Sequence, residues 1–260
     1  MSMSGEFAIR SVAVIGSKGQ MGRLFKNLCI ESGLRVTELD KPLTHEVLTR
    51  AVSFADLVLL AVPIQAMAEV LEAVVPYLSP SQIMADLCSV KVGPVERMLA
   101  SWSGPVVGTH PLFGPRPPEG ERSVAVTPGR DDAALAAVES WLAGLGFSVF
   151  RTTAHEHDKA MAFIQGLNFV TSVAYLSATA GLPAIERFVT PSFRRRLDAA
   201  YKMLTEDAGL FEAIFETNPY SQEAVRLFRS HLNVAAGGDV SLLAERANWW
   251  WRDDKERGGA

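Results

Sequence analysis

Short apolar runs alternate with amphipathic stretches over the first 150 residues of the chain. The runs that predict strands are 11–15, 34–39, 57–62, 83–87, 106–109, 123–126 and 147–150, and helical spacing is clearest over 21–32, 65–78 and 131–145. Continuous apolar runs are typical of strands that are buried on both faces. Their alternation with helices predicts parallel pairing through right-handed crossovers. We therefore expect residues 1–152 to form an α/β domain around a doubly wound parallel sheet.

Residues 153–260 show helical spacing only, which predicts a second, all-α domain. One long helix that ends near Gly181 carries a wide apolar stripe. The stripe consists of Met161, Ile164, Leu167, Phe169, Val170 and Val173. Further helices are expected over 191–216, 219–236 and 239–256. A stripe of this width needs more cover than short neighbouring helices give, so we expect a homodimer through this domain.

Composition narrows the classes of function. The 260 residues are 48% hydrophobic and 21% charged with a formal net charge of −4, which is typical of a globular protein and argues against nucleic acid as a partner. The chain opens without a signal-peptide pattern, and no apolar run approaches the roughly 18 residues that span a bilayer. We therefore expect a cytoplasmic protein without membrane contact. Cys29 and Cys88 lie far apart, which favours two buried apolar side chains over redox or metal chemistry.

A glycine-rich segment, GSKGQMG, lies between the first predicted strand and a predicted helix. In that context Gly16 permits a tight turn, Gly19 lets the backbone approach a pyrophosphate, and Gly22 lets helix and strand pack closely. Free N–H groups at the start of the helix complete an anion site. The segment predicts a nicotinamide-dinucleotide site of the Rossmann type. Its cofactor-binding residues would be Gly16, Ser17, Lys18, Gly19, Gln20, Met21 and Gly22, with Val62 and Pro63 after the third strand.

Asp40 ends the second predicted strand, about 20 residues beyond the loop. A carboxylate at this position accepts a hydrogen bond from the ribose 2′-hydroxyl and repels a 2′-phosphate, which favours NAD over NADP. Lys18 and Lys41 lie close enough in the sequence to meet a phosphate, so NADP stays open as the cofactor. A strand-end turn residue is the other interpretation of Asp40.

Polar residues follow two further strands, where ligands of open parallel sheets bind. One segment is DLCSVK, which contains Ser89, and the other is GTHPLFGP, which contains His110. Pro111 restricts His110 to extended backbone, which suits a fixed catalytic base. A purely structural histidine is the alternative.

The long helix opens with the segment HEHDKAMAFIQGLN, residues 155–168. Asp158, Met161, Gln165 and Asn168 recur at the spacing of one helix face, which predicts a polar ligand at the domain interface. His155, His157 and Asp158 could instead bind a metal, but such positions diverge at a helix start, and we expect no metal. The three tryptophans at 249–251 are expected to pack the last helix against its own domain or a partner rather than to stack on a ligand.

Together these segments resemble the prephenate dehydrogenase family of tyrosine biosynthesis, most closely the dehydrogenase part of enzymes that are fused to a chorismate mutase. The matching pieces GSKGQMG, DLCSVK, GTHPLFGP and EHD…MAFIQ occur in order over nearly the whole chain. We expect neither a chorismate mutase segment nor a C-terminal regulatory domain in these 260 residues. The resemblance implies NAD-dependent oxidative decarboxylation of prephenate to 4-hydroxyphenylpyruvate.

By this resemblance His110 would accept the proton of the C4 hydroxyl as hydride leaves for the nicotinamide. An unperturbed imidazole pKa of about 6.5 leaves such a base largely neutral. Ser89 would hydrogen-bond the same region and orient the base, and Gln165 would line the pocket. Aromatisation supplies driving force, so the protein mainly positions the ring and the nicotinamide.

Two positions depart from the family pattern. Asn168 stands where the family carries a histidine after the helix glutamine, and Lys202, five residues before Asp207, stands where the family uses an arginine to grip a substrate carboxylate. Lysine keeps the charge but loses the bidentate fork, and Arg194 or its two neighbours could supply the grip. Gln165, Asn168, Lys202 and Arg194 are therefore the predicted substrate-binding residues, and arogenate and 4-amino-4-deoxyprephenate become alternative substrates.

Two other hypotheses come from different classes. Dehydrogenases of β-hydroxyacids or imines also join a Rossmann domain to a helical one, but they place a catalytic Lys or Asp where this helix offers Gln165 and Asn168. A dinucleotide-binding regulator without catalysis is consistent with the two departures. His110 together with Ser89 argues against a regulator.

Overall fold

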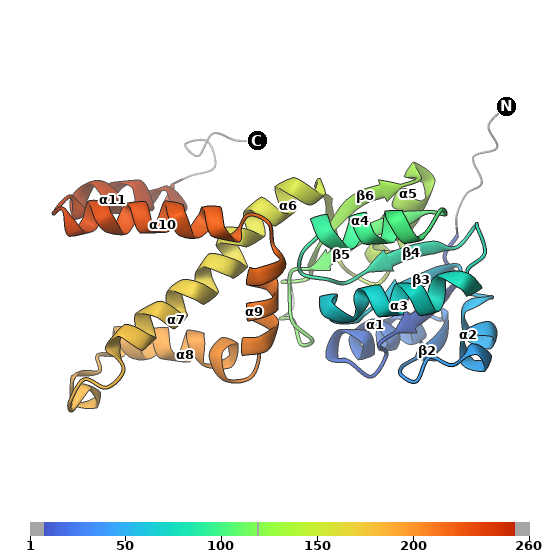
Figure 1. Cartoon of the computed structure of the whole chain (residues 1–260), viewed down its shortest axis with the longest axis horizontal. Coiled ribbons are helices and arrows are strands. Elements are labelled where there is room, and N and C mark those ends of the chain that lie inside the picture. Colours follow the sequence, from blue (N-terminus) through green and yellow to red (C-terminus); the bar gives the residue numbers. More distant parts are fainter. Residues whose placement is uncertain (1–7, 119, 253–260) are drawn as a thin grey trace.

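The computed structural model describes residues 8–118 and 120–252, which form a sheet domain and a helical arm joined by one long helix (Figure 1). The strands are β1 Ser11–Ile15, β2 Arg35–Leu39, β3 Leu57–Leu60, β4 Ile83–Asp86, β5 Val106–Pro111, β6 Ser123–Arg130 and β7 Ser148–Arg151. They form a single seven-stranded sheet in the order β2-β1-β3-β4-β5-β6-β7. From β1 the chain adds β2 on one side and then β3, β4 and β5 on the other, and this reversal of direction is that of a doubly wound fold.

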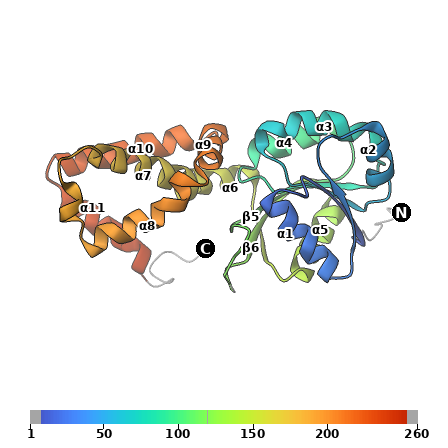
Figure 2. The same cartoon turned by 90° about the horizontal axis from the view of Figure 1, so that it is seen from below.

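Helices cover both faces of this sheet (Figure 2). The helices of the sheet domain are α1 Gln20–Glu31, α2 His45–Val52, α3 Met67–Val74, α4 Val92–Ser101 and α5 Asp132–Gly144. Val12 and Val14 belong to the core that β1 shares with α1 and α5, whereas Ala13 and Ile15 belong to the core shared with α2, α3 and α4. Because successive strand residues point to opposite faces, the continuous apolar run of β1 fills both cores.

The expected all-parallel sheet needs a correction at one edge. Strands β1 to β5 are parallel, but β6 pairs with β5 in antiparallel register, with His110 opposite Ala125. The physical reason is the connection: residues 112–118 and 120–122, the described part of it, contain no helix, and only a crossover connection would return the chain in the parallel direction. Strand β7 again runs parallel to β6, after the crossover through α5. Strand β5 also extends past the predicted 106–109, so His110 lies inside it.

The helical domain begins with a continuous helix from Ala154 to Thr179. Its parts are α6 Ala154–Met161, a π-helical segment Ala162–Leu167 and α7 Asn168–Thr179, followed by α8 Pro191–Thr205, α9 Ala208–Thr217, α10 Ser221–Ala236 and α11 Val240–Ala247. The single helix expected over 191–216 is two helices. The N–H groups of Glu206 and Asp207 both donate to the carbonyl of Lys202, which ends α8.

The π-helical segment changes the face that the sequence pattern predicts. Asp158 and Met161 are buried, Gln165 is half-buried and Asn168 is exposed. A π-helix hydrogen-bonds from i to i+5, so its wider turn breaks the spacing from which one common face is expected. The segment contacts α9 and α10, and a Cβ on Gly166 would lie only 3.4 Å from the hydroxyl of Ser221.

Much of the apolar surface of the helical domain is exposed. The helix over residues 154–179 has the length and the mean hydropathy, 1.2, of a membrane-spanning helix, so the expectation that no segment reaches that range is wrong. Only 22% of the most apolar 18-residue part of this helix is buried within the described structure. Trp250 and Trp251 are 59% and 79% exposed, so the described residues of their own domain do not cover these two rings as expected.

Candidate active site

A fully buried ion pair ties the end of β4 to β5. Lys91 Nζ lies 2.5 Å from Asp86 Oδ2, and neither side chain is exposed to solvent. Lys91 Nζ also donates to the carbonyl of Thr109 at 2.7 Å, and the hydroxyl of Thr109 donates to the carbonyl of Asp86. A buried charge pair persists only where further hydrogen bonds offset its desolvation, as they do here. The network holds the residue that precedes His110.

His110 is joined to the long helix by a chain of side-chain hydrogen bonds. Its Nδ1 lies 2.8 Å from His157 Nε2, and His157 Nδ1 lies 2.7 Å from Asp158 Oδ1. The Asp158 carboxylate also accepts hydrogen bonds from the backbone N–H groups of Lys91 and Val92, at 2.7 and 2.8 Å. Asp158 thereby caps the first turn of α4 from another helix.

These contacts determine the tautomers of both rings. The Asp158 carboxylate accepts the hydrogen bond from His157, so the proton of a neutral His157 is on Nδ1 and its Nε2 is an acceptor. That acceptor faces His110 Nδ1, which must therefore donate. The unprotonated nitrogen of His110 is then Nε2, which makes no hydrogen bond within residues 8–118 and 120–252. The arrangement presents one imidazole lone pair as a proton acceptor.

Electrostatics keep this acceptor neutral. Burial is the largest cause that holds the pKa of His110 well below its usual range, and the neighbouring His157 ring and Lys91 ammonium lower it further. His110 is only 2% exposed. The imidazole is therefore neutral at pH 7, with its proton on Nδ1 and Nε2 free, which is the state that a general base requires.

The long helix is held against this site from the far side. Asn218, between α9 and α10, donates from Nδ2 to the carbonyl of Asp158 at 2.7 Å and is itself buried. From the sequence, His157 is considered only as an unlikely metal ligand, Asp158 is expected on the ligand-facing side of the helix, and Asn218 is not singled out. Their adjacency to a buried strand-end histidine is a property of the fold, although the EHD segment itself was a visible signal.

The other predicted catalytic and pocket residues, Ser89 and Gln165, are not part of the hydrogen-bonded chain that ends at His110. Ser89 is half-buried between β4 and α4, and its hydroxyl makes no hydrogen bond with any residue that the structure describes. The contact that orients His110 comes from His157 instead. Gln165 lies in the π-helical segment, and its Oε1 atom is buried without a hydrogen-bond partner among the described residues. An unpaired buried amide oxygen is available to a ligand.

The predicted carboxylate-binding residues lie on α8, which packs against α7 and α9. Lys202 Nζ is 3.2 Å from Asp207 Oδ2, so its charge already has a partner, and the lysine side chain is 57% exposed. Arg194 is exposed, and the guanidinium of Arg196 lies 3.9 Å from the centroid of the Tyr175 ring.

The glycine loop has the geometry of a phosphate cradle. Gly16 has a φ of +87°, and a Cβ there would lie 2.3 Å from the carbonyl oxygen of Ala61. A Cβ on Gly22 would lie 2.1 Å from the carbonyl oxygen of Gly16. No side chain caps the start of α1, so its first N–H groups face outward for an anion. The residues present therefore fit the pyrophosphate of a dinucleotide.

Asp40 lies beside this loop. Its carboxylate accepts a hydrogen bond from the Ser17 hydroxyl at 2.5 Å and from the Lys18 N–H at 3.1 Å. Lys41 Nζ is bonded to both carboxylate oxygens of Glu69, each at 2.7 Å, and the Lys18 side chain is exposed. Val62 and Pro63 follow β3 at the same edge of the sheet.

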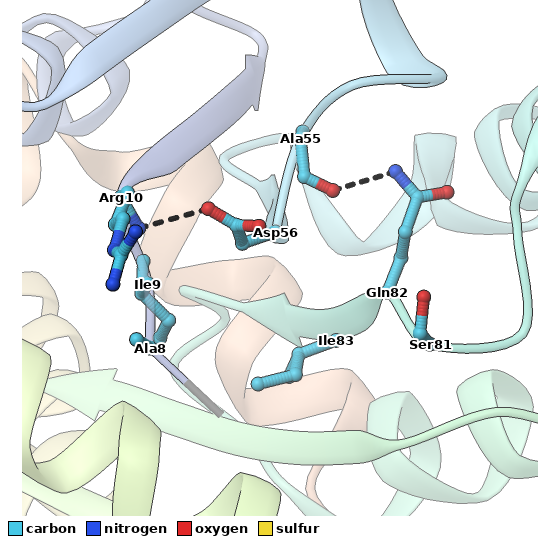
Figure 3. A pocket seen from close by; sticks show the side chains of 8 residues that line it. All are labelled: Ala8, Ile9, Arg10, Ala55, Asp56, Ser81, Gln82 and Ile83. Carbon is cyan, nitrogen blue, oxygen red and sulfur yellow. Dashed lines mark hydrogen bonds between the residues drawn. The ribbon is translucent and has the colours of Figure 1, made fainter. Parts of the chain in front are cut away.

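One hollow lies at the opposite edge of the sheet, where the strands begin (Figure 3). It measures about 330 Å³ and is lined by residues from the starts of β1, β3 and β4. The polar side chains of Asp56 and Gln82 there are already hydrogen-bonded to the protein. Cys29 and Cys88 are buried free thiols, and no cluster of three or more His, Cys, Asp or Glu able to hold a metal occurs within residues 8–118 and 120–252.

A dinucleotide cradle after β1 and a buried neutral histidine near the end of β5, both toward the carboxyl edge of a doubly wound sheet, define a nicotinamide-dependent dehydrogenase with a helical second domain. Residues 34–150 match the model of the prephenate dehydrogenase nucleotide-binding domain. The chain is 31% identical over 265 aligned residues to a T-protein of Enterobacter agglomerans, covering 96% of this chain and 69% of that protein. The chain therefore belongs to the prephenate dehydrogenase family.

Other relatives carry different names. A 4-amino-4-deoxyprephenate dehydrogenase of Streptomyces pristinaespiralis is 28% identical over 66% of this chain and 64% of that protein. A T-protein of Haemophilus influenzae is 30% identical over 79% of this chain, which spans only 56% of that protein.

Solved structures share the fold across both domains. Prephenate dehydrogenase from A. aeolicus, solved with hydroxyphenyl propionate and NAD+, superposes with a TM-score of 0.73 at 20% identity and covers 92% of this chain and 96% of that one. Arogenate dehydrogenase from Synechocystis superposes with a TM-score of 0.72 at 23% identity, over 92% and 97% of the two chains. At these identities the likeness establishes the fold, and with it the expected pairing of a Rossmann domain with a helical domain.

Proposed function

We propose that this chain catalyses the NAD-dependent oxidative decarboxylation of prephenate to 4-hydroxyphenylpyruvate. The observation that carries the proposal is the hydrogen-bonded chain His110–His157–Asp158, which leaves Nε2 of a buried neutral His110 as the proton acceptor. The T-protein similarity, which extends over 96% of this chain, supports the same activity.

The chemistry requires one base and a fixed geometry. His110 Nε2 accepts the proton of the C4 hydroxyl while the C4 hydride leaves for the nicotinamide. The bound nicotinamide supplies the hydride acceptor. The ring carboxylate then departs as CO2, its bonding electrons aromatise the ring, and the proton held by His110 is available to the phenolate oxygen. Asp158 accepts a hydrogen bond from His157 Nδ1–H, which leaves His157 Nε2 as the acceptor for His110 Nδ1–H, so the pair stabilises a cationic His110 while it holds the proton.

The substrate side of the site is assigned to the helical domain. Gln165, whose Oε1 lacks a partner, would bind a polar group of the substrate, and Asn168 would follow it along the helix. Lys202 or Arg194 would meet a substrate carboxylate, and Ser89 would contact the reacting end of the ring. The division between the two domains would fall at Thr153, the residue that caps α6.

We further propose that the enzyme is a homodimer through the helical domain. The exposed large apolar side chains concentrate there, including Leu232 at 52%, Leu242 at 60% and Trp251 at 79%. Contiguous exposed apolar surface marks interaction sites. A second copy is the occupant best supported, because exposed apolar side chains, including Ile164 and Val173, also lie along the helix that carries His157 and Asp158.

The test is turnover by the purified protein with prephenate, arogenate and 4-amino-4-deoxyprephenate offered separately, each with NAD and with NADP. We expect NADH formation to be fastest with prephenate. The aminodeoxyprephenate arm is included because of the Streptomyces relative and because a neutral base could accept a proton from nitrogen as well as from oxygen. Absence of turnover with all three substrates would refute the proposed activity. His110→Gln should abolish kcat and leave the dissociation constant for NADH nearly unchanged.

A further inference from the structure

We infer that the hydroxyl of Ser17 determines the choice between NAD and NADP by fixing the carboxylate of Asp40. The inference rests on the proposed use of a nicotinamide dinucleotide. Ser17 is the second residue of the glycine loop and is 1% exposed, so its hydroxyl has no access to water. It donates to Asp40 Oδ2 at 2.5 Å, which is a short contact between a hydroxyl and a carboxylate.

The glycine loop donates its stronger hydrogen bonds to one oxygen of the Asp40 carboxylate, Oδ2, and leaves the other oxygen, Oδ1, with free acceptor capacity. The backbone N–H of Lys18 also donates to Oδ2, at 3.1 Å, and reaches Oδ1 only at 3.3 Å. Each carboxylate oxygen has about two acceptor sites, so Oδ2 is filled and Oδ1 retains capacity. The ribose 2′-hydroxyl of NAD needs one such acceptor at the end of the second strand. Ser17 thus orients Asp40 so that the remaining acceptor is in a fixed position.

The same bond disfavours a 2′-phosphate. A phosphate at this place would be repelled by the carboxylate unless Asp40 rotated away. Rotation would leave the Ser17 hydroxyl buried without a partner, which is costly. The neighbouring cation Lys41, which could otherwise meet the phosphate, is held by Glu69. The Lys18 carbonyl is in turn bonded by Arg23 Nε at 2.7 Å, so the loop that carries both donors is tied to α1.

The chain contains a matched control for this pair. Ser11 Oγ donates to Asp56 Oδ2 at 2.7 Å and is 6% exposed, so it repeats the buried serine–aspartate bond at the other end of β1. Ser11→Ala removes the same kind of hydrogen bond from the same strand region but far from the cofactor edge. It therefore reports the purely structural effect of losing such a bond.

The experiment measures dissociation constants for NADH and NADPH by fluorescence titration of the full-length protein without substrate. Wild type should bind NADH more tightly than NADPH. Ser17→Ala should reduce the ratio of the NADPH to the NADH dissociation constant about five- to tenfold, the effect of one net hydrogen bond. Ser11→Ala should leave the ratio unchanged. In an Asp40→Asn background, Ser17→Ala should have no further effect on the ratio, because Ser17 acts through the carboxylate.

An unchanged ratio in Ser17→Ala, or the same change with and without Asp40→Asn, would overturn the inference. A wild type that prefers NADPH would also overturn it while leaving a dehydrogenase function intact. If neither dinucleotide binds to the wild type, the proposed function fails together with the inference. The turnover assay described above is independent of all these titrations, so the two failures are distinguishable.

Discussion

His157→Phe tests whether a second histidine positions the catalytic base. The substitution keeps a flat ring on α6 but removes the acceptor that faces His110 Nδ1 at 2.8 Å and the donor that faces Asp158 at 2.7 Å. His110 then has no partner to hold its proton on Nδ1. The tautomer with the proton on Nε2, which cannot accept a proton from substrate, becomes accessible.

The magnitude follows from the burial of these groups. His110 is 2% exposed, so the productive tautomer of the variant carries a buried N–H donor without an acceptor. Such a donor costs about 1–3 kcal/mol, which corresponds to a fall in kcat of about 5- to 150-fold. The KM for prephenate should change little, because the lost contact is behind the base and away from the substrate.

The assay is steady-state NADH formation, with two companion variants. His157→Gln restores an acceptor toward His110 through its amide oxygen and should recover part of kcat. His155→Phe removes a ring two residues away, on the opposite face of the same helix, where His155 Nδ1 contacts the Tyr220 hydroxyl at 2.7 Å, and should keep wild-type kcat. A His157→Phe enzyme with normal kcat, or with a raised KM alone, would refute the positioning role.

Three further predictions follow from the same structure. Because the pKa of His110 is held well below its usual range, kcat/KM should stay flat as pH falls through 6.5, and a half-maximal rate near pH 6.5 that belongs to His110 would contradict this assignment. Lys202→Ala should raise the KM for prephenate and leave kcat unchanged. The control, Lys26→Ala, breaks a comparable 3.2 Å pair with Glu38 on the sheet domain and should leave the KM unchanged. An unaltered KM in Lys202→Ala would assign carboxylate binding to the arginines of α8. Leu242→Asp should convert the dimer to a monomer, as measured by light scattering after gel filtration. Phe54→Asp, which changes an exposed apolar residue of the sheet domain, should leave the dimer intact. A monomeric wild type would refute the dimer.

Much of the site could be predicted from local sequence, because its chemistry is carried by short segments. Gly22 is required by a steric limit within the loop, since a Cβ there would meet the Gly16 carbonyl, whereas Gly16 is required both by its positive φ and by the carbonyl of Ala61, which follows the neighbouring strand β3. His110 was similarly recognisable from its strand and the proline that follows it.

The partners of these residues could not be predicted in the same way. His157 lies 47 residues from His110 in the chain, and Asn218 lies 60 residues from Asp158, so no periodicity links them. The reversed strand β6 and the π-helical segment also escaped the pattern, since both arise from how segments pack rather than from their own spacing.

The sequence by itself determined the alternation of strands and helices in the first half of the chain and the helical character of the second half, and it placed the candidate reacting groups in short segments, because apolar periodicity is a local constraint. The tertiary structure alone decided which nitrogen of His110 is free, that Ser17 holds Asp40, and that the apolar helix remains largely exposed. Those properties depend on which groups meet across the fold, and hydrogen-bond geometry and desolvation are defined only once they do.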